Sequence, residues 1–299
     1  MKNGEARRHS RGNSLRKEAK KAYLFLILWF IGMLCFYLYP FLSALVSSFT
    51  NSTLVRGSFV GLDNYKKAFS DTRFLKSLKV TTIYVFVGVP LKLVFALFLA
   101  CLLKKGSTFF RTALYIPSLF GSSVAVAVMW RQLFGKSGVI SVLLGFFGVP
   151  ARNWIAYPKT ALSILILLAV WQFGSTMVIF IAGLKNIPQE YYEAASVDGA
   201  SAMDQFRHIT LPMLTPTIQF NLIQQLVGAF QVFTQGYIIT EGGPMDNTLF
   251  SVLYIYQTAF NRMRVGYASA MSWILFLIIT AISVLVFWSS KYWVFYQNE

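Results

Sequence analysis

Few side chains in this 299-residue sequence are of types that could carry out covalent chemistry. The two histidines, His9 and His208, are too few for a histidine metal site. The two cysteines, Cys35 and Cys101, both lie in apolar runs, where cysteine usually serves as a small packing residue. The sequence contains no Gly-x-x-x-x-Gly-Lys-Ser/Thr loop, so we do not expect this chain to hydrolyse ATP. We therefore predict no catalytic residue, no metal site and no cofactor on this chain.

Charged residues are also rare inside the long apolar runs, which contain no Asp, Glu or His. Proton- or sodium-coupled carriers usually need such groups at mid-membrane depth, and an intramembrane hydrolase needs a base or metal ligands. The sequence therefore disfavours both classes of protein. It does not exclude a channel. Lys92 is the exception, because it lies near the middle of an apolar run, where a lysine costs about 2.5–3.5 kcal/mol to insert. Either Lys92 pairs with carbonyls or hydroxyls inside a helix bundle, or it lines a solute pathway.

Uncharged polar side chains form a second group in two later apolar runs. Trp171, Gln172 and Ser175 lie in one run, and Asn221, Gln224 and Gln225 lie in the next. Helical spacing places residues 221, 224 and 225 on one face. Amides can donate to and accept from sugar hydroxyls, and an indole can stack on a sugar ring. The alternative is that these amides join helices, at about 0.6 kcal/mol each.

One polar segment stands between apolar runs, from Glu193 to Ala200, and Ile209–Pro212 follows it. Asn186 as a cap and Pro188 in the first turn predict a helix start, and Gly199 predicts a left-handed end. Ser201 with Asp204 predicts a capping box on a second short helix. The loop 185–215 has a net negative charge, so we expect it to bind a protein rather than to lie on anionic lipid.

The composition indicates that the segments carrying these residues lie in a membrane. Apolar residues make up 56% of the chain and charged residues 13%, against about 25% charged in soluble domains. We predict an all-α, polytopic membrane protein, because backbone groups in hydrocarbon must be paired within each segment. Each predicted span is near or above the roughly 20 residues that cross a bilayer. The six spans cover about 22–46, 80–103, 112–131, 160–184, 216–239 and 267–290.

Charge distribution predicts the orientation of these spans in a bacterial cytoplasmic membrane. Residues 1–21 carry eight Lys/Arg and form a basic tail that we expect to remain cytoplasmic. An even number of spans then places the tail 291–299 and the loop 185–215 on the same side. The run 139–149 is too short to span and fits an interfacial or re-entrant piece. The formal net charge of +16 suggests anionic headgroups rather than nucleic acid as a partner.

Several stretches together resemble the permease subunits of binding-protein-dependent carbohydrate importers of the maltose-type class of ABC transporters. The segment Glu193–Gly199 with Leu211 and Pro212 matches the EAA motif of that family. The other matching stretches are Phe59–Tyr65, Phe110-Arg111 with Pro117, Thr240–Pro244, and Tyr256-x3-Phe260. The chain departs from the maltose-type permease in having six spans instead of eight and in carrying Lys92 where an apolar or small residue is usual.

The resemblance implies a complex and roles for individual residues. The expected partners are a second homologous permease, two ATPase subunits that bind ATP and Mg, and an extracytoplasmic solute-binding protein. A cytoplasmic coupling helix would dock into a groove on the ATPase, with Tyr191 and Tyr192 filling that groove. Coupling residues are expected to be Tyr191, Tyr192, Glu193, Ala194, Ala195, Asp198 and Gly199. The substrate pathway, in the fourth and fifth spans and at Lys92, is expected to involve Lys92, Trp171, Gln172, Ser175, Asn221, Gln224 and Gln225.

Charge outside the membrane adds a hypothesis about the cargo. The predicted external stretch 47–79 carries six Lys/Arg against two acids, and the stretch 132–159 carries basic residues only. Together with Lys92, this suggests an acidic sugar, although an acidic face on the binding protein would explain the exterior equally well. A carbohydrate importer subunit is the function that we expect. The alternatives are an importer for a non-sugar solute and a channel or scaffold without ATP coupling.

Overall fold

The computed structural model describes residues 23, 26–53, 57–104, 106–121 and 123–295. Three helical segments among these residues are long and apolar enough to cross a membrane: Leu26–Ser48, α4 (Thr72–Leu103) and α14 (Val265–Ser290). Two bent helix pairs raise the number of spans to five if each pair is one span. The predicted basic tail 1–21 lies outside the described residues, as does part of the tail 291–299. The prediction of a helical, polytopic membrane protein is confirmed.

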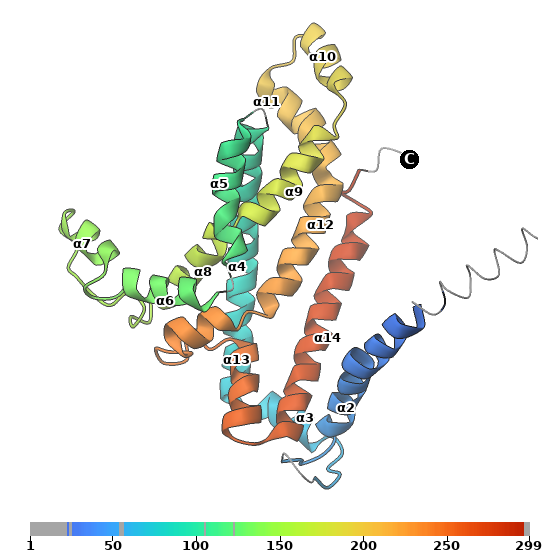
Figure 1. Ribbon diagram of the computed structural model, residues 1–299, viewed down its shortest axis with the longest axis vertical. Helices are drawn as coiled ribbons and strands as arrows, with labels where there is room; N and C mark the ends of the chain where they lie inside the picture. Colours follow the sequence, from blue (N-terminus) through green and yellow to red (C-terminus); the bar gives the residue numbers. More distant parts are fainter. Residues whose placement is uncertain (1–22, 24–25, 54–56, 105, 122, 296–299) are drawn as a thin grey trace, which may run out of the picture.

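Helix α4 is the centre of the bundle (Figure 1). It begins at Asp71, whose carboxylate accepts hydrogen bonds from the backbone N–H groups of Arg73 and Phe74 at 3.0 and 3.1 Å. It packs against α8 (Ala161–Trp171), α9 (Gly174–Lys185) and α12 (Leu211–Phe230). Ala96 and Ala100 are fully buried on α4. Small residues at such contacts let neighbouring helices approach closely, which favours helix association in lipid.

The third predicted span, 112–131, is broken instead of continuous. Helices α5 (Thr108–Leu119) and α6 (Val124–Leu133) meet at 94°. The break is capped, because the Ser123 hydroxyl accepts a hydrogen bond from the Val126 N–H at 3.3 Å and so starts α6 anew. The fourth predicted span, 160–184, is also bent, by 42° between α8 and α9. An apolar run alone therefore did not reveal where the backbone turns.

The fifth predicted span, 216–239, begins and ends earlier than expected. Helix α12 runs from Leu211 to Phe230, with Pro216 inside it, so the helix already begins within the predicted loop 185–215. Its amides and prolines lower its hydropathy, and α12 is not among the five apolar candidates. After α12 come a π-helical turn η3 (Gly236–Thr240), α13 (Ser251–Tyr256) and a second π-helical turn η4 (Gln257–Asn261).

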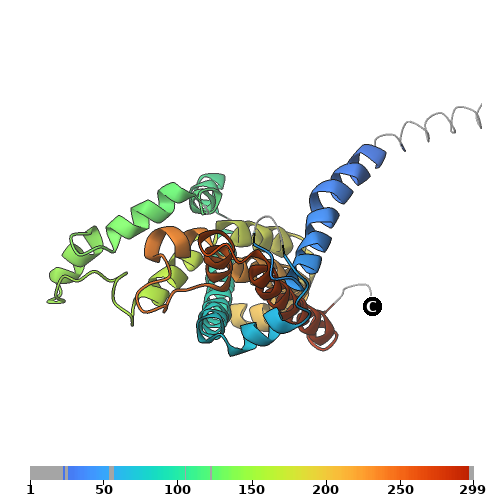
Figure 2. The same ribbon diagram turned by 90° about the horizontal axis from the view of Figure 1, so that it is seen from below.

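Two apolar parts of the chain project from this bundle (Figures 1 and 2). The first span contains a π-helical turn η1 (Leu34–Leu38) and α2 (Tyr39–Ser48), and it contacts α14 through Phe41, whose ring lies 4.6 Å from that of Trp273. None of its most apolar stretch is buried within this chain. The second part contains the short helix α7 (Val139–Gly145), which lies in the run 139–149 and is followed by the exposed Phe146 and Phe147.

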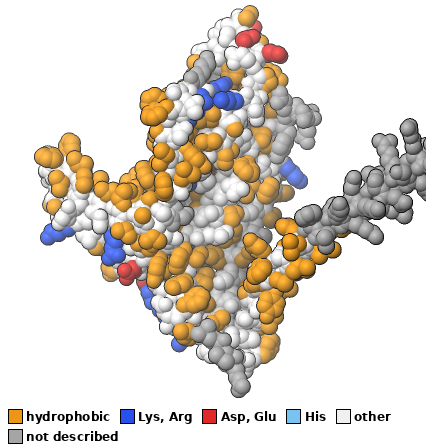
Figure 3. Space-filling model, in the orientation of Figure 1, with side chains coloured by type: hydrophobic (Ala, Val, Ile, Leu, Met, Phe, Trp, Pro, Cys, Tyr) orange, Lys and Arg blue, Asp and Glu red, His pale blue; other side chains and the backbone are white. Residues whose placement is uncertain are grey.

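On the face shown in Figure 3, hydrophobic side chains spread over the middle of the bundle, between its two ends. One end, called here the α10 end, holds α10 (Gln189–Val197) and α11 (Ala202–Gln205). The opposite α3 end holds α3 (Asp63–Ser70) and α13. Loops predicted to share a side contact each other: Lys104 lies over the ring of Tyr192 at the α10 end, and Arg73 pairs with Asp246 at the α3 end.

Candidate functional site

A polar cavity of about 230 Å³ lies between α4, α8 and α12 and the segment that follows α12. It brings together three residues predicted for a solute pathway, Lys92, Gln172 and Gln225. The other side chains at its wall that the argument uses are Tyr84, Gln231, Phe233, Thr234 and Gln235. At about 30 Å³ per molecule, the cavity has room for roughly eight waters, which a ligand with several hydroxyls could replace.

Two cavity amides are held in place by the break between α5 and α6. The side-chain nitrogens of Gln172 and Gln235 both donate to the Gly121 carbonyl, at 2.7 and 3.3 Å. Each amide keeps a carbonyl oxygen that can accept further hydrogen bonds. A side chain at position 121 would collide with Gln172, because a Cβ there would lie 2.7 Å from its amide carbon. The broken third span therefore positions the polar wall of the cavity.

An aromatic series begins at this cavity and continues to the α3 end. It consists of Phe233, Tyr237, Tyr256 and Phe260. Phe233, at the cavity wall, has its ring 5.3 Å from that of Tyr237 and 5.1 Å from that of Tyr256. Tyr256 in turn lies 5.0 Å from Phe260, the two aromatics of the Tyr256-x3-Phe260 stretch. Tyr237 and Phe260 are exposed. Amides beside aromatic faces form a surface suited to sugars, which present both hydroxyls and apolar ring faces.

Four residues predicted for the pathway do not line this cavity. Trp171 packs at 5.9 Å from the ring of Trp130, and Ser175 donates its backbone N–H to the Ser118 hydroxyl at 3.0 Å. Asn221 is fully buried and donates to the Thr217 carbonyl at 3.2 Å within its own helix. Gln224 is exposed on the surface of this chain. Trp171 and Ser175 thus contact other helices of the bundle, whereas the Asn221 bond stays within α12 and does not join helices.

Lys92 differs from the other cavity residues in carrying a charge. Its side chain is half-buried and reaches the cavity wall. Among the residues that the structure describes, no hydrogen-bond acceptor or carboxylate is paired with its ammonium group. The alternative in which Lys92 pairs with carbonyls or hydroxyls of its own bundle is therefore not seen.

At the α10 end, α10 and α11 form the elbow predicted from the Glu193–Ala200 segment. Gly199 has φ +80°, the left-handed conformation that glycine adopts without strain. Its N–H donates to the Ser196 carbonyl at 3.2 Å, and the N–H of Ala200 donates to the Ala195 carbonyl at 2.9 Å. These two bonds are the Schellman pattern that closes a helix. The predicted helix end at Gly199 is confirmed.

The start of the second helix is also confirmed, whereas the start of the first is not as expected. The Ser201 hydroxyl and the Asp204 carboxylate form a reciprocal capping box. Hydrogen bonds from the Ser201 hydroxyl and N–H lower the pKa of Asp204 below its usual value, although burial acts in the opposite direction. Asn186 does not cap α10, because it ends α9 in a helical conformation and Pro188 holds the cap position.

The two tyrosines predicted to fill a partner groove point in different directions. The Tyr191 side chain is 46% exposed. Tyr192 is half-buried, its hydroxyl lies 2.9 Å from that of Thr210, and Lys104 lies 4.5 Å from the centre of its ring. These contacts fasten Tyr192, and with it the elbow, to the bundle, and the role of Tyr192 in a groove on another subunit stays a prediction. Glu193, Ala194, Asp198 and Gly199 are exposed, and Ala195 is half-buried.

The elbow is continuous with the helix that lines the cavity. From Ala202 the chain stays helical through α11, a π-helical turn η2 (Phe206–Thr210) and α12 to Phe230. The η2 turn comes directly before Pro212, which cannot donate a backbone hydrogen bond, and a π-turn is one way a helix accommodates this loss. Because α12 contributes Gln225 to the cavity, one helical run joins the two regions.

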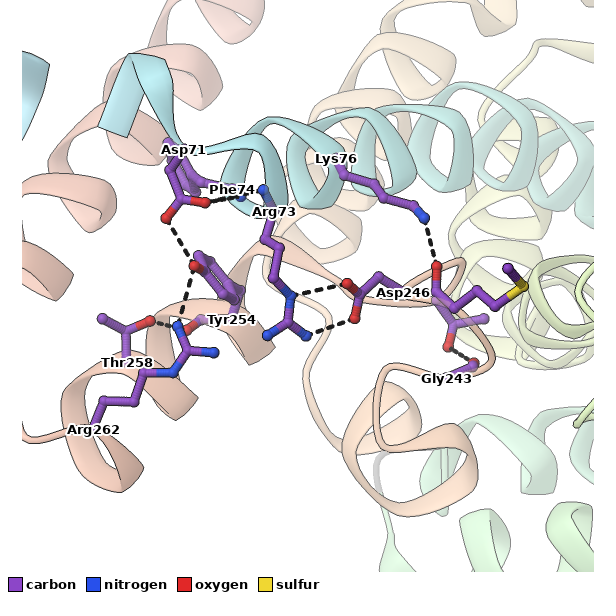
Figure 4. Close-up of polar contacts among 11 residues, drawn as sticks. Asp71, Arg73, Phe74, Lys76, Gly243, Asp246, Tyr254, Thr258 and Arg262 are labelled. Carbon is purple, nitrogen blue, oxygen red and sulfur yellow. Dashed lines mark hydrogen bonds and ion pairs between the residues drawn. The ribbon is translucent and has the colours of Figure 1, made fainter. Parts of the chain in front are cut away.

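The α3 end carries a network of hydrogen bonds that joins α4 to the loop 240–250 (Figure 4). Arg73 donates to both carboxylate oxygens of Asp246, at 2.9 and 2.7 Å, and this contact lowers the pKa of Asp246. Lys76 donates to the Met245 carbonyl in the same loop. Both Met245 and Asp246 have φ above +50°, so these contacts hold the loop in a conformation that residues other than glycine rarely adopt.

Asp71 is the second centre of this network. Its carboxylate accepts hydrogen bonds from the hydroxyls of Tyr254 and Tyr267, both at 2.8 Å, in addition to the two N–H groups at the start of α4. Burial alone would raise the pKa of Asp71, but these hydrogen bonds outweigh burial and lower the pKa below its usual value. Sequence reasoning missed this network, because its contacts join residues that are 169 to 196 positions apart.

The comparisons with known proteins agree with this geometry. Residues 54–294 match a family described as "Binding-protein-dependent transport system inner membrane component". The chain is 50% identical over 297 residues to the probable ABC transporter permease protein YesP of Bacillus subtilis (strain 168), covering 97% of this chain and 96% of YesP. It is 35% identical to the arabinooligosaccharides transport system permease protein AraP of the same organism, covering 89% and 88% of the two chains.

A solved structure shares the fold. This structure is a bacterial alginate ABC transporter in complex with an alginate pentasaccharide-bound periplasmic protein. The superposition has a TM-score of 0.82 and covers 92% of this chain and 95% of the other, at 21% sequence identity. The similarity therefore extends over nearly the whole bundle and is one of fold.

Proposed function

This chain belongs to the family of binding-protein-dependent transport system inner membrane components, the permeases of ABC importers, and we propose that it forms half of the membrane pathway of a carbohydrate importer. The other half would be a second homologous permease. Two ATPase subunits would supply the energy, and an extracytoplasmic solute-binding protein would deliver the sugar. The relative AraP, named for arabinooligosaccharide transport, supports a carbohydrate as the solute.

The observation that carries this proposal is the polar cavity between α4, α8 and α12. Gln172, Gln225 and Gln235 supply amides to its wall, and Phe233 begins an aromatic series next to them. Sugar hydroxyls need such donors and acceptors, and sugar rings stack on aromatic faces. An apolar solute would leave these amides without partners, which costs about 1–3 kcal/mol for each buried group.

Coupling to ATP would use the elbow at the α10 end. Helix α10 exposes the apolar side chains of Tyr191 and Val197 and the acidic side chains of Glu190 and Glu193, which a partner could contact. A partner that binds this elbow can move the helical run from Ala202 to Phe230 as a unit, and so move the cavity wall at Gln225. The π-turn η2 provides a position at which that run can bend. Alternating access would follow from such movement.

The α10 end would face the cytoplasm of a bacterial cell. Lys104, Arg111, Lys185 and Arg207 lie at or near this end, and the basic tail 1–21 adds to the same charge. Basic residues next to membrane spans favour the cytoplasmic side. The α3 end, with the Asp71 and Asp246 contacts, would then face the solute-binding protein.

Co-purification tests the proposed complex. We would express the chain with the genes next to its own, extract it in mild detergent and identify the proteins that remain bound. An ATPase and a second permease should bind the native chain and the Glu241→Ala variant, which loses an exposed carboxylate at the α3 end. The ATPase should be lost from a Glu193→Ala, Gly199→Arg double variant. A chain that purifies alone in every case would contradict the proposal.

A further inference from the structure

The cavity contains a cation without a compensating carboxylate from its own chain. Lys92 reaches the cavity wall, where the other named polar groups are uncharged amides and hydroxyls. The carboxylates of the described residues all lie at the ends of the bundle: Asp63, Asp71, Glu190, Glu193, Asp198, Asp204, Glu241 and Asp246. A lysine held at this depth is costly unless an anion or a water-filled space accompanies it, so the position requires an explanation.

Cations at the α3 end do not share this property, because several of them are used within the structure. Arg73 binds Asp246, and Lys76 binds the Met245 carbonyl. Arg131 lies 3.9 Å from Glu241, and Arg262 donates to the Tyr254 hydroxyl at 3.3 Å. The positive charge of this surface is therefore weak support for an acidic solute, and the inference depends on Lys92.

We propose that Lys92 binds an anionic group on the transported sugar, so that the importer prefers a sugar carrying a carboxylate or a phosphate. The inference rests on the function proposed above. The ammonium group has three donors and acts as a point charge, which suits either anion. The amides of Gln172, Gln225 and Gln235 would bind hydroxyls of the same sugar, and Phe233 would contact its ring.

A bound anion would also offset the free-energy cost of placing the Lys92 ammonium group inside the membrane. A charge-assisted hydrogen bond is about twice as strong as a neutral one. Lys92 would thus favour a charged sugar over its neutral counterpart by roughly 10- to 100-fold in affinity. Replacing Lys92 by an uncharged amide of similar length should remove this preference for the charged sugar.

The test uses the complete importer in lipid nanodiscs without its solute-binding protein, so that the selectivity of that protein does not enter. Three probes are titrated: a disaccharide that contains a uronate, the same disaccharide with its carboxylate reduced to an alcohol, and a phosphorylated disaccharide. The variants are Lys92→Gln, Lys92→Arg and a matched control on the same helix, Lys79→Gln, whose exposed side chain lies at a separate cleft near the α3 end. ATP-driven uptake of the same probes is measured separately, with the same variants in proteoliposomes and the solute-binding protein present.

We expect native protein, Lys92→Arg and Lys79→Gln to prefer a charged probe by roughly 10- to 100-fold, and Lys92→Gln to lose that preference. The probe that shows the preference identifies carboxylate or phosphate as the anion. Equal binding of charged and neutral probes by native protein would overturn the inference and leave the importer intact. Loss of assembly or of all binding in Lys92→Gln would assign Lys92 a structural role and also overturn it. If no sugar is bound or moved by native protein, the proposed function itself fails.

Discussion

Adding a methyl group at Gly199 should reveal the effect of backbone strain alone, without the effect of a steric clash. Its φ is +80°, and a Cβ added there would meet no atom within 4 Å. A Gly199→Ala change therefore introduces strain and no collision inside this chain. The left-handed conformation costs a residue with a side chain about 1–2 kcal/mol. Asparagine tolerates this conformation better, so Gly199→Asn should cost less.

This strain should appear in the affinity for the ATPase. If docking needs the elbow between α10 and α11 in the observed conformation, 1–2 kcal/mol corresponds to a loss of about 5- to 30-fold in affinity. We would titrate the ATPase subunits onto the permease pair in nanodiscs for the native chain, Gly199→Ala and Gly199→Asn. Gly145→Ala is the control, because it also adds a methyl group in open space, far from the elbow.

The order of the variants in their affinity for the ATPase shows whether strain at Gly199 weakens docking. We expect native and Gly145→Ala to bind alike, Gly199→Asn to bind less tightly and Gly199→Ala to bind least tightly. Equal losses of affinity for Gly199→Ala and Gly199→Asn would show that the partner has no room for a side chain at position 199. The left-handed backbone would then not be the cause of the loss. Unchanged binding in both variants would refute the role of the elbow.

Other predictions follow from packing and titration. Gly266→Ala should destabilise the detergent-solubilised protein by about 1–3 kcal/mol, because its Cβ would lie 2.0 Å from a backbone carbonyl oxygen; a melting midpoint unchanged from native would contradict this. Because hydrogen bonds lower the pKa of Asp71, the stability that this group contributes is present above its unfolded pKa of about 3.9 and is lost as pH falls through the lower folded value. Asp71→Asn should therefore lower the melting midpoint at pH 7, and its difference from native should shrink below about pH 4; a constant difference would refute the assignment. Tyr192→Phe removes a 2.9 Å hydrogen bond with the Thr210 hydroxyl, which contributes about 1 kcal/mol to the stability of the elbow. The change should speed hydrogen exchange in 189–199. Unchanged exchange would exclude the role of Tyr192 in fastening the elbow.

Sequence reasoning predicted the features that depend on local chemistry. The apolar runs predicted a helical, polytopic membrane protein, Gly199 marked the end of α10, and Ser201 with Asp204 marked the start of α11. Each of these signals involves residues within a few positions of one another. Lys92, Gln172 and Gln225 could be singled out because a charge or an amide in an apolar run is conspicuous, and the structure places all three around one cavity. Their role in a solute pathway stays a prediction.

The features that were missed depend on contacts between distant segments. The break at Gly121 matters because Gln172 and Gln235 bind its carbonyl, and neither contact can be read from the sequence near it. Tyr191 and Tyr192 are adjacent and chemically identical, yet only the packing of Lys104 and Thr210 decides which of them turns inward. Trp171 and Asn221 have the chemistry of a sugar site, but Trp171 packs against Trp130 and Asn221 is buried in α12, both outside the cavity wall.

ATP-driven uptake in proteoliposomes tests the central claim most directly. This chain would be reconstituted with the second permease, the ATPase pair and the solute-binding protein, and a labelled oligosaccharide would be followed into the vesicles. We predict accumulation that requires ATP and the binding protein and that falls sharply with the Glu193→Ala, Gly199→Arg double variant. Sugar entry that proceeds equally without ATP, or that is unaffected by the double variant, would contradict the account.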